Sequence, residues 1–150
     1  MHVSFPLSIG DAAREAGVST RALRYYEEMS LLRPAAYSAG GHRLYGPAEL
    51  TRVARIRELQ DLMGFNLAEI AGVLANEDRL DSLRDAFHRV EDGAERHRIL
   101  EEALAVLDAL DEQVTVKQRR LAQFRRQIAA RRARAEAAGA EMATKEVVPG

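Results

Sequence analysis

The chain has 150 residues, a formal net charge of −1 and no cysteine. The absence of cysteine excludes disulfides, thiolate metal sites and iron–sulfur clusters of the usual ligation. Charged residues make up 30% of the chain and aromatic residues 5%, a balance that favours helices, including a long one. No apolar run approaches the ~20 residues that cross a bilayer, and the start lacks a signal peptide. We therefore expect a cytoplasmic protein with no membrane partner.

The charges are unevenly distributed along the chain. Acids outnumber bases between Glu77 and Glu112, whereas eight bases and no acid occur from Lys117 to Arg134. The low net charge argues against non-specific coating of nucleic acid, but it leaves a local DNA contact open. The basic run itself suits either a solvated helix end or an additional DNA contact, and we favour the solvated end.

Two short helices joined by a glycine open the chain. Residues 9–16 are amphipathic and end at Gly17, and Ser19 is a good N-cap for a second helix that reaches Met29. One flank of this second helix is apolar, at Ala22, Leu23, Tyr26 and Met29. The other flank carries donors and charge, at Thr20, Arg21, Arg24 and Tyr25. The pattern is typical of a DNA-binding helix-turn-helix. Two ordinary core helices with solvated arginines are the alternative.

A hairpin follows the second helix. Pro34 ends the helical pattern, and residues 37–45 form two short extended pieces around Gly40-Gly41. Arg43 and Tyr45 alternate with Leu44 and so share the opposite face. A hairpin beside a helix-turn-helix is a wing, with His42 at its tip; a plain connecting loop is the alternative.

Three further helices are predicted between the hairpin and the long helix that follows. The first begins at Pro47 and runs to Met63. The next runs over 67–75, with Asn66 as its N-cap and Glu69 completing a capping box. A separate amphipathic helix covers 80–90.

From Ala94 to about Arg134 the sequence predicts one continuous helix of about 60 Å. Its apolar residues recur alternately every three and four positions, and Lys117 interrupts them. A one-faced helix of this length needs a partner helix, most simply the same helix of a second copy. The alternative is a helix that folds back on its own domain. The seam residues are Leu100, Ala103, Leu107, Leu110, Val114, Leu121, Phe124 and Ile128.

No catalytic chemistry is indicated. Ser, His and Asp occur without the spacing of a nucleophile elbow or a zinc-hydrolase helix. His88 and His97 are too far apart for an i, i+4 metal pair. We expect no catalytic residue, no metal, no cofactor and no enzyme.

Taken together, the motifs resemble the MerR family of bacterial transcription regulators over roughly residues 8–75. The stretches that carry the resemblance are Ile9-Gly10-Asp11, Gly17-Val18-Ser19, Leu23-Arg24-Tyr25-Tyr26-Glu27, Leu31-Leu32-Arg33-Pro34, Gly41-His42-Arg43-Leu44-Tyr45, Ile56-Arg57-Glu58-Leu59, Gly64-Phe65-Asn66-Leu67 and Glu69-Ile70. The resemblance implies a mainly α fold, with a winged helix-turn-helix DNA-binding domain followed by a long dimerisation helix that forms an antiparallel coiled coil.

The resemblance also implies roles for individual residues. Thr20 and Arg21 should meet base edges in the major groove. Ser19, Arg24 and Tyr25 should hold phosphates. The wing residues that should grip the backbone at the minor groove are His42, Arg43 and Tyr45.

The family's activity gives the expected function. Its members bind a pseudo-palindromic promoter as homodimers and distort a spacer that is too long for RNA polymerase holoenzyme, in response to an inducer. Here the inducer is unknown: metal and redox sensing use cysteines, and no chain remains for a drug-binding domain. An effector cavity lined by Phe87, Val90, Ile99 and Leu104 is one alternative, but these residues suit packing better. The alternatives are an architectural DNA-bending protein without a switch and a helical adaptor that does not contact DNA.

One turn departs from the family pattern. Met63 is an extra residue before Gly64, and Asp61 occupies the position where the family usually has a basic or neutral residue. We therefore carry over no phosphate contact from this turn; Arg52, Arg55 or Gln60 are the candidates to compensate. The expected domains are a DNA-binding domain over 7–76, a connecting helix over 77–92, a dimerisation helix over 93–134 and a disordered tail over 135–150.

Overall fold

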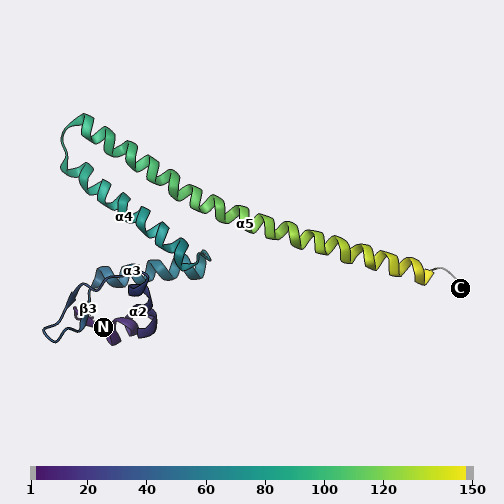
Figure 1. Ribbon diagram of the computed structural model, residues 1–150, viewed down its shortest axis with the longest axis horizontal. Coiled ribbons are helices and arrows are strands. Elements are labelled where there is room, and N and C mark those ends of the chain that lie inside the picture. The colour runs from purple at the N-terminus through teal and green to yellow at the C-terminus, as the bar shows by residue number, and fades with distance from the viewer. Residues whose placement is uncertain (1–2, 148–150) are drawn as a thin grey trace. The chain divides into compact units, whose positions relative to one another are not determined.

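The computed structural model describes residues 3–147 and is mainly helical with one small antiparallel sheet, as predicted (Figure 1). The chain divides into two compact units, one that ends at Val106 and one that begins at Leu107. No helix among the described residues is long and apolar enough to span a membrane. The elements are, in order, β1 Leu7–Ser8, α1 Ile9–Ala16, α2 Thr20–Glu28, β2 Ala36–Tyr37, β3 Arg43–Tyr45, α3 Pro47–Arg57, a π-helical turn η1 Glu58–Leu62, α4 Leu67–Arg89 and α5 Gly93–Val147.

Helices α1 and α2 form the predicted helix-turn-helix. Gly17 ends α1 in the left-handed conformation (φ 68°), as expected of a C-terminal glycine. The Ser19 hydroxyl accepts a hydrogen bond from the Ala22 amide at 3.0 Å and caps α2. Leu23 and Tyr26 are buried as predicted. Met29, the C-cap after the last turn of α2, is 40% exposed, which corrects the prediction that it packs with them.

The predicted hairpin is confirmed, and it belongs to a three-stranded sheet in the order β1-β3-β2. In the hairpin, Tyr37 pairs with Arg43, and the Ser38 amide donates to the His42 carbonyl at 2.8 Å. Gly41 supplies the positive φ (79°) that closes the turn. Strand β1 was not predicted, because its two residues are too few to show an alternating pattern.

The extra residue before Gly64 is absorbed by the turn η1. Here the Met63 amide donates to the Glu58 carbonyl at 3.3 Å, five residues back instead of four. Such a wider turn is how a helix takes in one inserted residue. The helix predicted over 47–63 is therefore an α-helix followed by a π turn.

The predicted helices 67–75 and 80–90 are one helix, α4. The residues between them include no glycine or proline that would end a helix. Two of them are held from α3: Arg52 donates to Asp78 at 2.6 Å, and Arg55 pairs with Glu77. Tertiary contacts thus add to a stretch that already favours helix.

Helix α5 corrects the prediction of a disordered tail. It runs through Val147, so residues 135–147 are helical, and only 148–150 of that predicted tail lie outside the described residues. The stretch is rich in alanine and glutamate, which have high helix propensity, and it directly continues an existing helix. The stretch is exposed throughout, including its large apolar residues Met142 and Val147, and exposure is a different property from disorder.

The core of the first unit lies where α1, α2, β3, α3 and α4 meet (Figure 1). It is built mainly from aliphatic side chains and includes two tyrosines, Tyr26 and Tyr45, and one phenylalanine, Phe65. Its largest fully buried members are Tyr45, Leu23, Ile56, Leu59, Ile70, Leu74 and Val53.

Replacing Ser30 with glycine should stabilise the chain. Ser30 follows α2 with a left-handed backbone (φ 59°), while the Leu31 amide donates back to the Tyr26 carbonyl at 2.9 Å. A side chain at such a position is strained, so Ser30→Gly should raise the free energy of unfolding by about 0.5–1 kcal/mol, measured by urea titration.

The matched control is Gly17→Ala, at φ 68° and with a new Cβ only 3.1 Å from Nη1 of Arg57. It should lower the free energy of unfolding by about 1 kcal/mol or more. A Ser30→Gly chain that unfolds at a lower urea concentration than wild type would contradict the assignment of strain.

Candidate nucleic-acid interface

The polar flank of α2 is exposed, as predicted. Thr20, Arg21, Arg24 and Tyr25 are all accessible, and the last three line a shallow hollow of about 590 Å³. Within residues 3–147, neither Arg21 nor Arg24 is held in an ion pair. The helix therefore presents two guanidinium groups that can receive an anion without first losing a partner.

One carboxylate joins this helix to the wing. Glu27 accepts a hydrogen bond from Nε of Arg43 at 2.5 Å and another from the hydroxyl of Tyr45. The Glu27 side chain is only 13% exposed, so water competes weakly for it. Both donors belong to β3, and the contact thereby fixes the wing against the recognition helix α2.

The protonation of these groups favours a permanent contact. The hydrogen bond from Arg43 to Glu27 raises the pKa of the Arg43 guanidinium above its ordinary value. Burial, followed by the hydrogen bond to Glu27, raises the pKa of the Tyr45 phenol well above its ordinary value. Both side chains thus keep their protons at neutral pH, and the contact does not respond to pH there.

The wing residues differ in what they can reach. His42 and Arg43 are exposed, and Arg43 commits only Nε to Glu27, which leaves its outer nitrogens available to a phosphate. Tyr45 is 1% exposed, which corrects the prediction that it grips the DNA backbone. Arg43 and Tyr45 do share a face, as predicted, but that face turns toward α2.

Sequence reasoning missed Tyr37. This tyrosine is 62% exposed on β2, directly across the hairpin from Arg43. An exposed aromatic ring beside a guanidinium suits contact with a nucleic-acid backbone or sugar. The strand pair is symmetric about Gly40 and not about the Gly40-Gly41 pair, so counting outward from the two glycines would have placed Tyr37 opposite Leu44.

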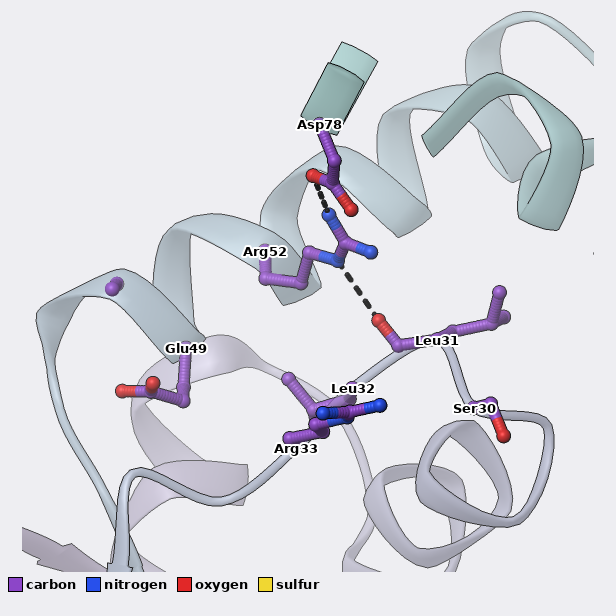
Figure 2. Close-up of a pocket in the computed structure, with 8 residues that line it drawn as sticks. Ser30, Leu31, Leu32, Arg33, Glu49, Arg52 and Asp78 are labelled. Carbon is purple, nitrogen blue, oxygen red and sulfur yellow. Dashed lines mark hydrogen bonds and ion pairs between the residues drawn. The ribbon is translucent and has the colours of Figure 1, made fainter. Parts of the chain in front are cut away.

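The two arginines expected to compensate at the turn before Gly64 have other roles. Figure 2 shows Arg52 with Nε donating to the Leu31 carbonyl at 2.8 Å and Nη1 donating to Asp78. Arg55 pairs with Glu77 and with Glu58. The hydrogen bond to Glu77 raises the pKa of the Arg55 guanidinium above its ordinary value. These side chains connect α3 to α4, so we no longer expect them to bind phosphate.

The hollow in Figure 2 does not resemble an effector pocket. Its volume is about 420 Å³, within the range of small-molecule sites, but such sites are mostly apolar. This one is open and lined by charged groups, two of which already pair with each other. Its residues are Ser30, Leu31, Leu32, Arg33, Ala48, Glu49, Arg52 and Asp78.

The apolar residues near the start of α5 are used in packing. The Arg96 guanidinium lies 4.0 Å from the centre of the Phe87 ring, and Ile99 is buried. Leu104 is exposed instead. Over residues 3–147, no three His, Asp or Glu side chains are grouped so that they could hold a metal ion.

A wing fixed beside an exposed, basic second helix defines the first unit as a winged helix-turn-helix. Residues 7–77 match the family model described as MerR HTH family regulatory protein. This segment is therefore similar to the MerR family, over the same residues as the sequence motifs predicted. The family consists of regulatory proteins, in agreement with the prediction that the chain is not an enzyme.

Individual relatives share the same segment. Over 68 residues the chain is 44% identical to an uncharacterized HTH-type transcriptional regulator of Pseudomonas aeruginosa, covering 45% of this chain and 51% of that protein. It is 42% identical over 72 residues to a probable heavy metal-dependent transcriptional regulator of Haemophilus influenzae, covering 48% and 56%. The chain thus spans about half the length of the curated relatives it matches. A solved MerR family transcriptional regulator from Bacillus cereus has 28% identity and a TM-score of 0.45, covering 76% of this chain and 75% of that one.

Removing the Glu27 carboxylate should destabilise the first unit. In Glu27→Ala the buried Tyr45 hydroxyl loses its acceptor and Arg43 loses its ion pair, so we expect the free energy of unfolding to fall by about 2–3 kcal/mol. Glu28→Ala is the matched control, because it removes the same charge from the exposed neighbouring position. It should change the free energy by no more than about 0.5 kcal/mol in the same urea titration. Equal effects of the two substitutions would contradict the structural role of Glu27.

Proposed function

We propose that this chain is a DNA-binding transcription regulator of the MerR type that acts as a homodimer on a pseudo-palindromic promoter. The observation that carries the proposal is the exposed basic flank of α2 with a wing fixed beside it by Glu27. A helix and a hairpin held in one geometry can enter adjacent grooves of a duplex together.

The residues divide into two roles. Thr20 and Arg21, at the first turn of α2, are proposed to meet base edges in the major groove. Arg24 and Tyr25 are proposed to hold phosphates. The Ser19 hydroxyl already accepts the Ala22 amide, so its proton remains available for a phosphate oxygen.

On the wing, His42, Arg43 and Tyr37 are proposed to contact the backbone. Tyr45 takes no direct part, since it supports Arg43 through their shared partner Glu27. Such backbone contacts set the position of the protein on DNA, whereas the first turn of α2 reads the sequence.

The dimer is proposed to form through α5. Apart from small Ala103 and half-covered Leu110, the predicted seam side chains are exposed, from 44% for Ile128 to 58% for Phe124. Apolar side chains at this spacing on a long helix are stabilised when a second helix covers them. A two-fold dimer would carry two α2 helices, which fits a pseudo-palindromic site. The seam is formed by Leu100, Ala103, Leu107, Leu110, Val114, Leu121, Phe124 and Ile128.

Control of transcription is proposed to work by distorting the promoter spacer, so that RNA polymerase holoenzyme can use it. An effector would have to bind the two DNA geometries with different affinity to act as a switch. An architectural protein that bends DNA without a switch is the competing function, because it would use the same surface.

DNA affinity should depend on α2 and not on arginines in general. With a duplex selected from a random library by the wild-type chain, Arg24→Ala should weaken binding about tenfold and lower the salt slope by about 1, since one phosphate contact is lost. Arg21→Ala should instead relax the base preference. Arg84→Ala, which removes an exposed arginine from α4, should leave affinity within about twofold.

Two outcomes would contradict the proposal. Failure to retain any duplex in low salt would exclude a DNA-binding regulator altogether. In transcription assays on a promoter that carries the selected site in a lengthened spacer, the chain should change the output. Binding and bending of that promoter without a change in output would indicate an architectural protein instead.

A further inference from the structure

Ten consecutive residues of α5 carry five arginines and no acid. This stretch, residues 125–134, is called the arginine segment, and every residue in it is exposed. It lies inside the continuous helix Gly93–Val147, so its backbone is already ordered. The sequence alone favours a solvated helix end here, whereas two features of the structure point to a bound anion. The arginines are Arg125, Arg126, Arg131, Arg132 and Arg134.

The first feature is the lack of ion partners. Exposed arginines nearer the start of α5 and on α4, such as Arg98 and Arg84, pair with acids of their own helix. Within residues 3–147, none of the five arginines of the arginine segment forms an ion pair. Glu136 is the nearest acid along the chain, but it follows Arg132 by four residues, and arginine before glutamate is the weaker order for such a pair. The charge of the segment is therefore uncompensated.

The second feature is the position of the arginines around the helix. At ~3.6 residues per turn, Arg126 lies nearly opposite the exposed apolar stripe that includes Leu121 and Ile128. That stripe ends at Ile128, and three residues later Arg131 stands where an apolar residue would continue it. A second α5 that covers the stripe cannot use Arg126. The dimer proposed above therefore leaves charge of the arginine segment uncovered.

Alanines between the arginines leave room for an anion. Arg125, Ala129 and Arg132 belong to the lining of one shallow hollow of about 290 Å³. Arg125 also lines a second hollow of about 360 Å³, together with Arg126. Because Arg125 and Arg132 are about two turns, or ~10 Å, apart along the axis, their guanidinium groups can reach separate phosphates of one strand.

We propose that the arginine segment binds the phosphate backbone of duplex DNA without reading bases, as a contact additional to α2 and the wing. The proposal rests on the DNA-binding function proposed above. A duplex held by α2 raises the local concentration of phosphate around the rest of the same chain. A contact made by charge alone then needs no fixed geometry, and guanidinium groups bind phosphate through paired hydrogen bonds.

A lipid surface fits the arginine segment less well than DNA does. A helix that lies on a membrane needs several large apolar side chains opposite its charges. Ile128 is the one large apolar residue of the segment, and the other uncharged residues are alanines and Gln127. The segment thus offers charge with almost no apolar face, which is what a phosphate backbone requires.

Neutralising the segment should weaken binding to every duplex by the same factor. In the chain with Arg126→Gln, Arg131→Gln and Arg134→Gln, three charges are lost while glutamine keeps the helix propensity. We expect its affinity for the selected duplex and for a scrambled duplex to fall at least about tenfold in low salt, and the salt slope to fall by about 2–3. The ratio of the two affinities should stay as in wild type, because backbone contacts carry no sequence information.

The matched control removes three exposed arginines from other parts of the chain, through Arg84→Gln, Arg89→Gln and Arg98→Gln. It changes the net charge by the same amount. It should bind both duplexes within about twofold of wild type and keep the salt slope, because distant exposed charges are screened. An equal loss in this control would show that net charge alone matters and would overturn the proposal.

Directed cleavage tests whether the segment lies on DNA. The chain has no cysteine, so Ala133→Cys places a single iron–EDTA label on the exposed surface of the arginine segment. With the duplex saturated by protein, this label should cut the DNA backbone. The cutting should disappear when the same label is carried by the chain with the three Arg→Gln changes of the segment. A label that does not cut, or that cuts equally well without these arginines, would overturn the proposal.

The wild-type chain separates the two levels of failure. If it binds no duplex, the proposed DNA-binding function is contradicted. If it prefers the selected duplex, and the chain with the neutralised segment binds both duplexes as wild type does, the DNA-binding function stands and only the role of the arginine segment is overturned. Unchanged DNA binding with lost binding to phosphatidylserine vesicles would assign the segment to a lipid surface and would also overturn the proposal.

Discussion

The surface proposed to face DNA depends on one carboxylate, Glu27, which binds two side chains of β3 from helix α2. The wing needs this contact because its strands are two and three residues long, and short hairpins are marginally stable by themselves. Pairing with β1 and burial of Tyr45 anchor one end of β3, and the Glu27–Arg43 pair anchors the other. The wing then leaves His42 and Tyr37 exposed on a fixed support.

A second group of charges connects this surface to the rest of the first unit. Arg52 joins α3 to the chain segment after α2 and to Asp78 of α4, and Arg55 joins α3 to Glu77. Because both acids lie on the same turn of α4, a rotation of α4 would have to break these pairs or move α3 with it. Packed helices joined in this way can carry a change from one element to the next, provided that a ligand favours one arrangement.

Local signals in the sequence predicted much of this fold. Gly17 and Ser19 located the helix-turn-helix, and the glycine pair located the hairpin, because caps and tight turns depend on single residues. Two of the predictions that were wrong depended on tertiary contacts, which the sequence does not display. Alternation placed Arg43 and Tyr45 on one face but could not tell that this face turns toward Glu27. The continuity of α4 was missed, because its middle has no apolar period and is held by arginines of α3. The exposed end of α5 was predicted to be disordered, because it has no apolar face; helix propensity alone keeps it helical.

Amide hydrogen exchange in the wing tests the central role of Glu27 most directly. The Ser38 amide donates to the His42 carbonyl and the Ala35 amide to the Leu44 carbonyl, so both report on the hairpin. In a Glu27→Ala chain these two amides should exchange at least tenfold faster than in wild type, while Val18, whose amide donates to Ala13, keeps its protection. Unchanged exchange at Ser38 and Ala35 would contradict the account, because the wing would then hold its place without Glu27.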